Sequence, residues 1–306
     1  MLTRAPFTDP NVTAKGEPRA WVPFDGLETL WLNTGTLCNL TCANCYIESS
    51  PRNDRLAYLT RDDVRTYLDE IARDRLPTRE IGLTGGEPMM NPEIIDILAD
   101  ILERGFDVLL LTNAMKPLHH KRKALLALNA AHPGKLHVRV SVDHFTRELH
   151  EEERGPGAWA PMIEGLSWLS ANRFHLSAAG RTRWGEAEAD LRLGYAALFA
   201  VHSIAIDASD PHRLVLFPEM DGRDVPEITT ACWDVLGKRA ADQMCARSRM
   251  VVRRKGEAAP SVVACTLQPY DQRFDFGATL AAAARAVPLN HPDCARFCVL
   301  GGGSCS

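Results

Sequence analysis

The sequence predicts an α/β protein whose main part is a partial (β/α)6 barrel of the TIM-like kind. Six apolar strand patterns alternate with helix patterns over about 180 residues, close to the ~30 residues that one βαβ repeat needs. The strand patterns are continuously apolar, which indicates a parallel sheet covered by helices. Polar side chains follow several of these strands, and such barrels carry their functional groups at the carboxyl ends of the strands.

The predicted elements follow one another in a regular βα order. The first helix begins after the N-cap Thr60, and the second begins with Asn91 as its N-cap and Pro92 in its first position. The second helix is predicted to stop at Gly105. Two more helices are predicted around residues 159–170 and 186–201. The predicted strands cover residues 28–34, 80–83, 108–111, 136–142, 174–178 and 204–207.

Charge and hydropathy exclude several classes of protein. The chain has 35 basic and 39 acidic residues, a net charge of -4, which argues against a nucleic-acid-binding surface. No stretch approaches the ~18 apolar residues of a membrane helix, and the N-terminus lacks the apolar core of a signal peptide. We therefore expect a cytoplasmic protein with neither nucleic acid nor a membrane as its partner.

The nine cysteines fall into two groups. Cys38, Cys42 and Cys45 stand close together, none occurs from 46 to 231, and six follow near the C-terminus. Since reducing compartments do not sustain disulfides, this distribution indicates two metal sites. Three thiolates leave one position of a metal or cluster open, whereas four would close it. A zinc knuckle, or three reduced core cysteines, are the alternatives for the first group.

The spacing Cys38-x3-Cys42-x2-Cys45 after a strand, followed by Gly85-Gly86-Glu87-Pro88, resembles the radical S-adenosylmethionine (SAM) superfamily. The resemblance implies a 4Fe-4S cluster on the three cysteines, with SAM chelating the fourth iron through its amino and carboxylate groups. One electron then cleaves SAM to methionine and a 5'-deoxyadenosyl radical, which abstracts a substrate hydrogen. An aromatic residue often precedes the third cysteine in this family. Here Asn44 stands there and Tyr46 follows the cysteine, which changes the expected packing around adenine.

The same resemblance implies a set of SAM-binding residues. The two glycines let the backbone approach a ligand closely, and in the family their segment contacts the SAM amino group, with the next glutamate as a second-sphere acceptor. A polar residue after the third strand contacts the ribose, and a serine at the fourth strand and a later arginine approach the ribose and the SAM carboxylate. Two arginines compete for that role. The cofactor-binding candidates are Tyr46, Gly85, Gly86, Glu87, Asn113, Ser141, Asp143, Arg154 and Arg181.

His144 and His150 also stand near the fourth strand. Each is a candidate proton donor or, alternatively, a structural histidine.

The C-terminal cysteines predict a second metal site. Residues 245–252 and 261–265 flank a polar turn and form a predicted β-hairpin with a cysteine at each outer end. The spacing resembles the twitch or SPASM domains that hold auxiliary clusters, in the one-cluster form, and implies a second 4Fe-4S cluster. Structural zinc is the alternative, because thiolate spacing does not separate zinc from iron and sulfide. The candidate ligands are Cys245, Cys265, Cys294 and Cys298, with Cys305 able to replace one of them and Cys232 left as a core thiol.

These assignments divide the chain into three parts and predict an enzyme. Residues 1–26 form a strap, 27–220 the barrel and 221–306 the auxiliary-cluster domain. The implied partners are a small-molecule or peptide substrate and a flavodoxin- or ferredoxin-type reductant. The short N-terminal segment leaves no room for a leader-peptide recognition domain, and residues 218–221 and 224–230 are the expected substrate-facing segments. A non-catalytic iron-sulfur carrier or redox sensor is the alternative.

Overall fold

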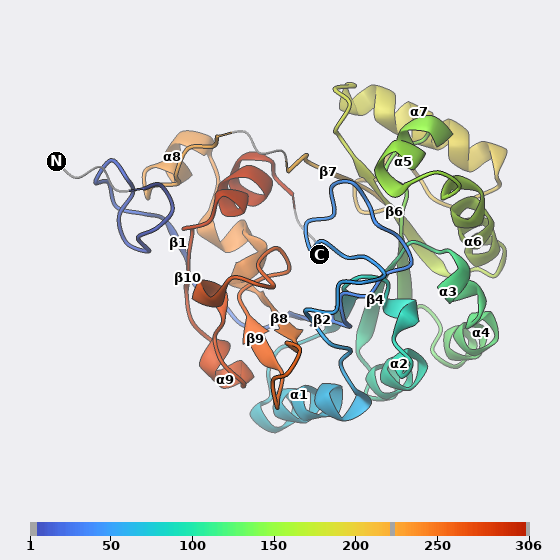
Figure 1. Cartoon of the computed structure of the whole chain (residues 1–306), viewed down its shortest axis with the longest axis horizontal. Helices are drawn as coiled ribbons and strands as arrows, with labels where there is room; N and C mark the ends of the chain where they lie inside the picture. The colour runs from blue at the N-terminus through green and yellow to red at the C-terminus, as the bar shows by residue number, and fades with distance from the viewer. Residues whose placement is uncertain (1–4, 221–223, 304–306) are drawn as a thin grey trace.

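The computed structural model describes residues 5–220 and 224–303, and its centre is a parallel sheet with helices on its outer side (Figure 1). Six parallel strands stand in the order β7-β6-β5-β4-β3-β2. This arrangement confirms the predicted fold class of a partial (β/α)6 barrel. The six strands are β2 (Thr29–Asn33), β3 (Glu80–Thr84), β4 (Asp107–Thr112), β5 (Leu136–Ser141), β6 (His175–Arg181) and β7 (Leu214–Phe217).

Helices follow these strands along the chain and bury their apolar faces against the sheet. The main core cluster combines residues of the strands with residues of α1, α2, α6 and α7. Burial of this apolar surface is the main stabilising contribution to such a fold. The helices are α1 (Arg61–Asp74), α2 (Ile94–Glu103), α3 (Lys116–His119), α4 (Arg122–Ala131), α5 (Arg147–Arg154), α6 (Trp159–Ala171) and α7 (Glu188–Val201).

The helix starts follow from local chemistry. Thr60 caps α1 as predicted: its hydroxyl accepts from the backbone N–H of Asp63, and the Asp63 side chain accepts from the backbone N–H of Thr60. The start of α2 differs from the prediction, since the helix begins at Ile94 rather than at Pro92. The Asn91 side chain accepts from the N–H of Glu93 and donates to two carbonyls of neighbouring loops. These bonds tie Asn91 to the loops, and the helix begins three residues later.

The sixth strand was predicted at the wrong place. Residues 204–207 form no strand, although Ile204 and Ile206 are buried as the alternating pattern indicated. The strand next to β6 is β7, which begins at Leu214. Between the two segments, Asp207 and Asp210 accept hydrogen bonds from backbone N–H groups in tight turns. Both segments are short and apolar, and only pairing with β6 selects the second one.

The predicted hairpin is confirmed and belongs to the same sheet as the barrel. Strand β8 (Ser248–Val252) pairs antiparallel with β9 (Ser261–Val263) and parallel with β2, so the sheet has eight strands. Cys245 precedes this hairpin and Cys265 follows it. Hydrogen bonds of one sheet thus join the parts of the chain before and after residue 220. The domain boundary at that residue stays a prediction. The other C-terminal elements are α8 (Cys232–Leu236), α9 (Leu280–Ala283), β10 (Val287–Pro288) and a π-helical segment, Cys294–Leu300.

Residues 5–22 of the N-terminal segment pack on the C-terminal part of the chain (Figure 1). Strand β1 (Trp21–Val22) pairs with β10, and Arg19 forms a buried ion pair with Glu227. Among the described residues, no helix is both long and apolar enough to cross a membrane.

Candidate functional site

One large pocket opens at the carboxyl ends of the barrel strands. It contains about 1180 Å³ of space, part of it open to solvent. Apart from Glu87, all the barrel residues predicted to hold the cluster or SAM line this pocket. They are Cys38, Cys42, Cys45, Tyr46, Gly85, Gly86, Asn113, Ser141, Asp143, Arg154 and Arg181.

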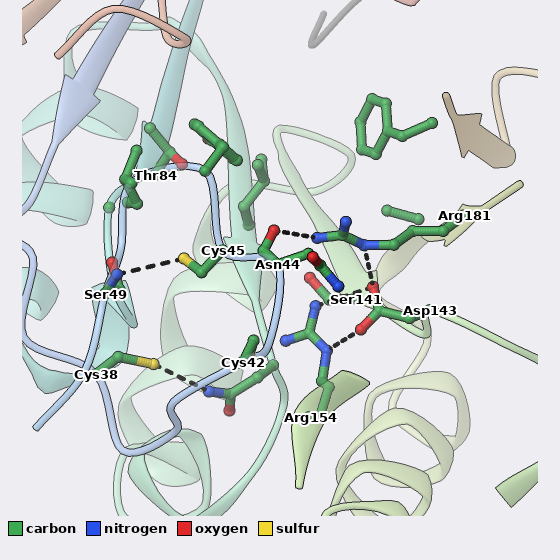
Figure 2. Close-up of a pocket in the computed structure, with 18 of the residues that line it drawn as sticks. Cys38, Cys42, Asn44, Cys45, Ser49, Thr84, Ser141, Asp143, Arg154 and Arg181 are labelled. Atoms are coloured by element: carbon green, nitrogen blue, oxygen red, sulfur yellow. Dashed lines mark hydrogen bonds and ion pairs between the residues drawn. The ribbon is translucent and has the colours of Figure 1, made fainter. Parts of the chain in front are cut away.

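The first three cysteines lie on the loop between β2 and α1 (Figure 2). The backbone N–H of Leu40 donates to Cys38 Sγ at 3.4 Å, and that of Ser49 donates to Cys45 Sγ at 3.3 Å. Burial raises the pKa of the Cys38 thiol to about 12 and also raises the pKa of Cys42. Metal binding would therefore release protons from these thiols.

The glycine pair of the second motif packs against the cysteine loop. A Cβ atom on Gly86 would lie 2.2 Å from the carbonyl oxygen of Leu37, and one on Gly85 would lie 2.5 Å from that of Gly35. The Gly86 N–H also donates to the Gly35 carbonyl at 2.8 Å. These glycines thus line the pocket and also allow two backbone segments to touch. The sequence-based interpretation considered only their approach to a ligand.

Glu87 lies behind the pocket wall with only 2% of its surface exposed. Its carboxylate accepts from the Thr112 hydroxyl at 2.8 Å, from the Asn113 N–H at 2.8 Å and from the Met89 N–H at 3.1 Å. Burial raises the pKa of this carboxyl despite the three bonds. Glu87 therefore fixes the end of β4, in keeping with a supporting place rather than a direct contact with SAM.

Asp143, after β5, is the meeting point of the two candidate arginines (Figure 2). Arg154 donates to both carboxylate oxygens, and Arg181 Nε lies 3.3 Å from Oδ1. Burial opposes ionisation of Asp143, but the two guanidinium groups outweigh it and hold the pKa of this carboxyl below its usual value. Arg181 also donates to the carbonyl of Asn44 at 3.2 Å. Both candidate arginines therefore belong to a single charged group around Asp143.

Glu153, on α5, was missed by the sequence interpretation. It is 1% exposed, and its carboxylate accepts from the backbone N–H of Asn44 at 2.9 Å and from the Asn44 side chain at 2.8 Å. Its own carbonyl accepts from the N–H of Ala43. Glu153 thus holds the backbone between the second and third cysteines. In the sequence it is one of three consecutive glutamates, which look like an exposed helix face.

The other predicted polar residues divide between the pocket and the core. The Asn113 side chain donates to Asn39 Oδ1 at 2.9 Å and accepts from a backbone N–H, so it fixes the cysteine loop as well as lining the pocket. His144 bridges Thr146 and Glu186. His144 and His150 are both buried outside the pocket wall, which supports their structural interpretation.

The pocket also has an apolar wall that comes mainly from the C-terminal half of the chain. The rings of Phe217 and Phe297 pack with their centroids 5.6 Å apart. Of the predicted substrate-facing segments, 218–220 reaches the pocket, while Asp221 lies outside the described residues. No residue of segment 224–230 lines the pocket, and Glu227 and Ile228 contact the N-terminal segment instead. The apolar wall comprises Leu111, Phe217, Pro218, Met220, Leu267 and Phe297.

A second, smaller pocket of about 400 Å³ is surrounded by the C-terminal cysteines. Burial raises the pKa of Cys245 to about 11 and that of Cys294 well above its usual value. Cys232 lies elsewhere, with its Sγ 3.3 Å from the N–H of Thr229, and Cys305 is outside the described residues. In residues 5–220 and 224–303, no three His, Cys, Asp or Glu side chains are grouped around one ion position. The cysteines that line the second pocket are Cys245, Cys265, Cys294 and Cys298.

Two known proteins are similar in sequence to part of this chain. Antilisterial bacteriocin subtilosin biosynthesis protein AlbA of Bacillus subtilis is 32% identical over 134 residues, 44% of this chain and 28% of AlbA. AdoMet-dependent heme synthase of Methanosarcina barkeri is 31% identical over 140 residues, 45% of this chain and 37% of the synthase. The matched region therefore spans less than half of each relative.

Solved structures share the fold at low sequence identity. SuiB of Streptococcus suis, bound to S-adenosylmethionine, superposes with a TM-score of 0.57 at 12% identity, over 82% of this chain and 63% of SuiB. The enzyme anSMEcpe with bound AdoMet gives a TM-score of 0.59 at 14% identity, over 84% of this chain and 79% of that one. The family model of the Radical SAM superfamily matches residues 32–179, from the end of β2 through the cysteine loop into β6. Residues 32–179 of this chain therefore belong to the radical SAM superfamily, whose members bind a 4Fe-4S cluster and SAM.

Proposed function

We propose that this chain is a radical SAM enzyme that holds a 4Fe-4S cluster on Cys38, Cys42 and Cys45. The observation that carries the proposal is that these three thiols, on one loop, open into the same pocket as the glycine pair. Three thiols without a fourth fit a cluster that leaves one iron for SAM. When bound, the cluster and SAM supply a carbon radical able to abstract hydrogen from a substrate.

The polar residues of the pocket wall support separate contacts for the different groups of SAM. The backbone at Gly85 and Gly86 faces the pocket without side chains, as a site for the SAM amino group requires. Arg154 and Arg181 bring positive charge to the pocket for a carboxylate, while Asp143 keeps both guanidinium groups oriented. Ser141, Asn113 and Tyr46 line the same space and are the proposed contacts for ribose and adenine.

We propose an auxiliary 4Fe-4S cluster in the second pocket, held by Cys245, Cys265, Cys294 and Cys298. The support is that these four thiols line one pocket. Leu267 lines both pockets, and Phe297 of the first is followed by Cys298 of the second. An electron leaving a substrate radical would have a short path between them. A flavodoxin- or ferredoxin-type protein is the proposed source of the electron that starts the reaction.

The test is a metal count joined to an assay of SAM cleavage. Protein reconstituted with iron and sulfide should bind about 8 iron per chain, as two four-iron clusters do, against about 4 if the C-terminal cysteines hold zinc. With dithionite and SAM it should release 5'-deoxyadenosine. An iron-loaded protein that releases none would contradict the enzyme and favour the electron-carrier alternative.

We further propose a peptide substrate that presents an apolar side chain to the pocket. The relative from Bacillus subtilis is named for biosynthesis of a bacteriocin. In this chain the apolar wall, with Phe217 and Phe297 in contact, lines the same pocket as the polar groups proposed for SAM. Burying an aliphatic or aromatic side chain against such a wall contributes about 1.5–3 kcal/mol.

Peptides encoded beside the gene provide the test of this substrate. We expect one of them to change mass when incubated with loaded enzyme, SAM and dithionite, at a residue with an apolar side chain. Phe297→Ala should raise the KM for that peptide about tenfold, equal to ~1.4 kcal/mol of lost contact. Modification of GTP in place of any peptide would point to a small-molecule substrate and contradict the proposal. GTP is a fair competitor because a relative from Saccharolobus solfataricus, 27% identical over 143 residues, is named a probable GTP 3',8-cyclase.

A further inference from the structure

Arg249, on β8, is among the most deeply buried side chains of the described structure. Its residue is 1% exposed. The guanidinium donates only to backbone carbonyls: Nε to Ala283 at 2.9 Å, and Nη1 to Cys245 and Ser248 at 2.6 Å. Nη2 donates to the carbonyl of Arg285 at 2.6 Å. The hydrogen bonds of this cation are therefore satisfied, but its charge is not neutralised by them.

Among the described residues, no carboxylate forms an ion pair with Arg249. Arg19, which is 2% exposed, behaves differently, since it pairs with Glu227. An isolated charge in a protein interior costs several kcal/mol unless an opposite charge compensates it. The guanidinium stays protonated in proteins. A buried anion next to Arg249 would remove this cost.

The groups that can supply the anion are the cysteines of the second pocket. Arg249 Nη1 donates to the backbone carbonyl of Cys245, and both Cys245 and Cys265 line that pocket. On its other side the guanidinium lies over the rings of Phe24, at 4.3 Å from the centroid, and Phe276, at 5.5 Å. The rings shield it from water, so its charge acts in a medium of low dielectric constant.

We propose that Arg249 is the counter-charge of the auxiliary cluster and raises its reduction potential. The inference rests on the auxiliary cluster of the proposed function. A four-iron cluster with four thiolates is negative in both oxidation states and gains one more negative charge on reduction. A fixed positive charge beside it therefore stabilises the reduced state more than the oxidised one. Arg249 acts as a tuning and positioning residue and touches no substrate.

The test is a redox titration followed by electron paramagnetic resonance. The full chain carries Cys38→Ala, Cys42→Ala and Cys45→Ala, so that only the auxiliary cluster contributes to the signal. In this background Arg249→Met should shift the reduction equilibrium about tenfold toward the oxidised state. For a one-electron couple this is a fall of ~59 mV in the reduction potential. Arg249→Gln, which keeps an amide to donate to the carbonyls, is a second neutral variant and should shift it in the same direction.

Two control variants separate charge from structure. Arg249→Lys keeps the charge and should stay closer to the parent potential than either neutral variant, whereas a merely structural role would move all three alike. Arg247→Met removes an equal charge two residues away, from a half-exposed side chain 3.6 Å from Glu28, and should leave the potential unchanged. If a neutral Arg249 variant binds the cluster and keeps the parent reduction potential, the inference about Arg249 is wrong, but the auxiliary cluster is not contradicted. A wild-type chain that binds only about 4 iron would overturn the auxiliary cluster and the inference together.

Discussion

Replacing Cys42 with alanine is expected to reduce 5'-deoxyadenosine release from SAM to background. The proposed barrel cluster has three protein ligands, and its pocket holds no spare thiol among the described residues, so the loss of one would open a second iron position. Iron content should fall from about 8 to about 4 per chain, because the proposed auxiliary cluster would keep its ligands. Chromatography of the reaction mixture and an iron and sulfide analysis of the same sample measure both effects.

The matched control is Cys232→Ala. This cysteine is hydrogen-bonded to Thr229 and lines neither pocket, so its removal should leave iron content and SAM cleavage close to the wild-type values. Undiminished 5'-deoxyadenosine release by the Cys42→Ala variant would refute the assignment of the barrel cluster.

The Gly86→Ala variant should lose stability and the barrel cluster together. The new methyl group would lie 2.2 Å from the Leu37 carbonyl oxygen and 2.6 Å from the Leu37 carbonyl carbon, distances that real Cβ contacts do not adopt. Because both partners are backbone, the cysteine loop must move, and Cys38 follows Leu37 directly. We expect the free energy of unfolding to fall by about 3 kcal/mol, the upper part of the range for overpacking. Urea unfolding and the iron content of the variant measure the two effects.

Gly105→Ala is the control for a glycine that has no such contact. Gly105 follows the end of α2 with a φ of +87°, and nothing lies within 4 Å of the position that a methyl group would take there. Alanine there should cost about 1–2 kcal/mol from backbone conformation alone and should not change iron binding. If Gly86→Ala retained all its iron, the glycine pair would have no part in holding the cysteine loop.

Local patterns predicted the parts of this protein that depend on local chemistry. The apolar strands, the capped start of α1 at Thr60 and the hairpin after Cys245 each follow from neighbouring residues, and the structure contains them. The strand predicted at 204–207 was wrong, because an apolar alternation does not show which of two short segments pairs with β6. Likewise Glu153 could not be separated from the glutamates beside it without the packing of α5 on the cysteine loop.

The sequence by itself determined the family, through the spacing of Cys38, Cys42 and Cys45 and the glycine pair, because a cluster site needs its ligands close together on one loop. Only the tertiary structure decided how the rest of the site is assembled. It joined two arginines on Asp143, set Gly86 against the cysteine loop, brought apolar residues of the C-terminal half into the pocket, and left Arg249 without a carboxylate among the described residues. The physical reason is that charge compensation, close packing and burial depend on distances between residues far apart in the chain, which local patterns do not contain.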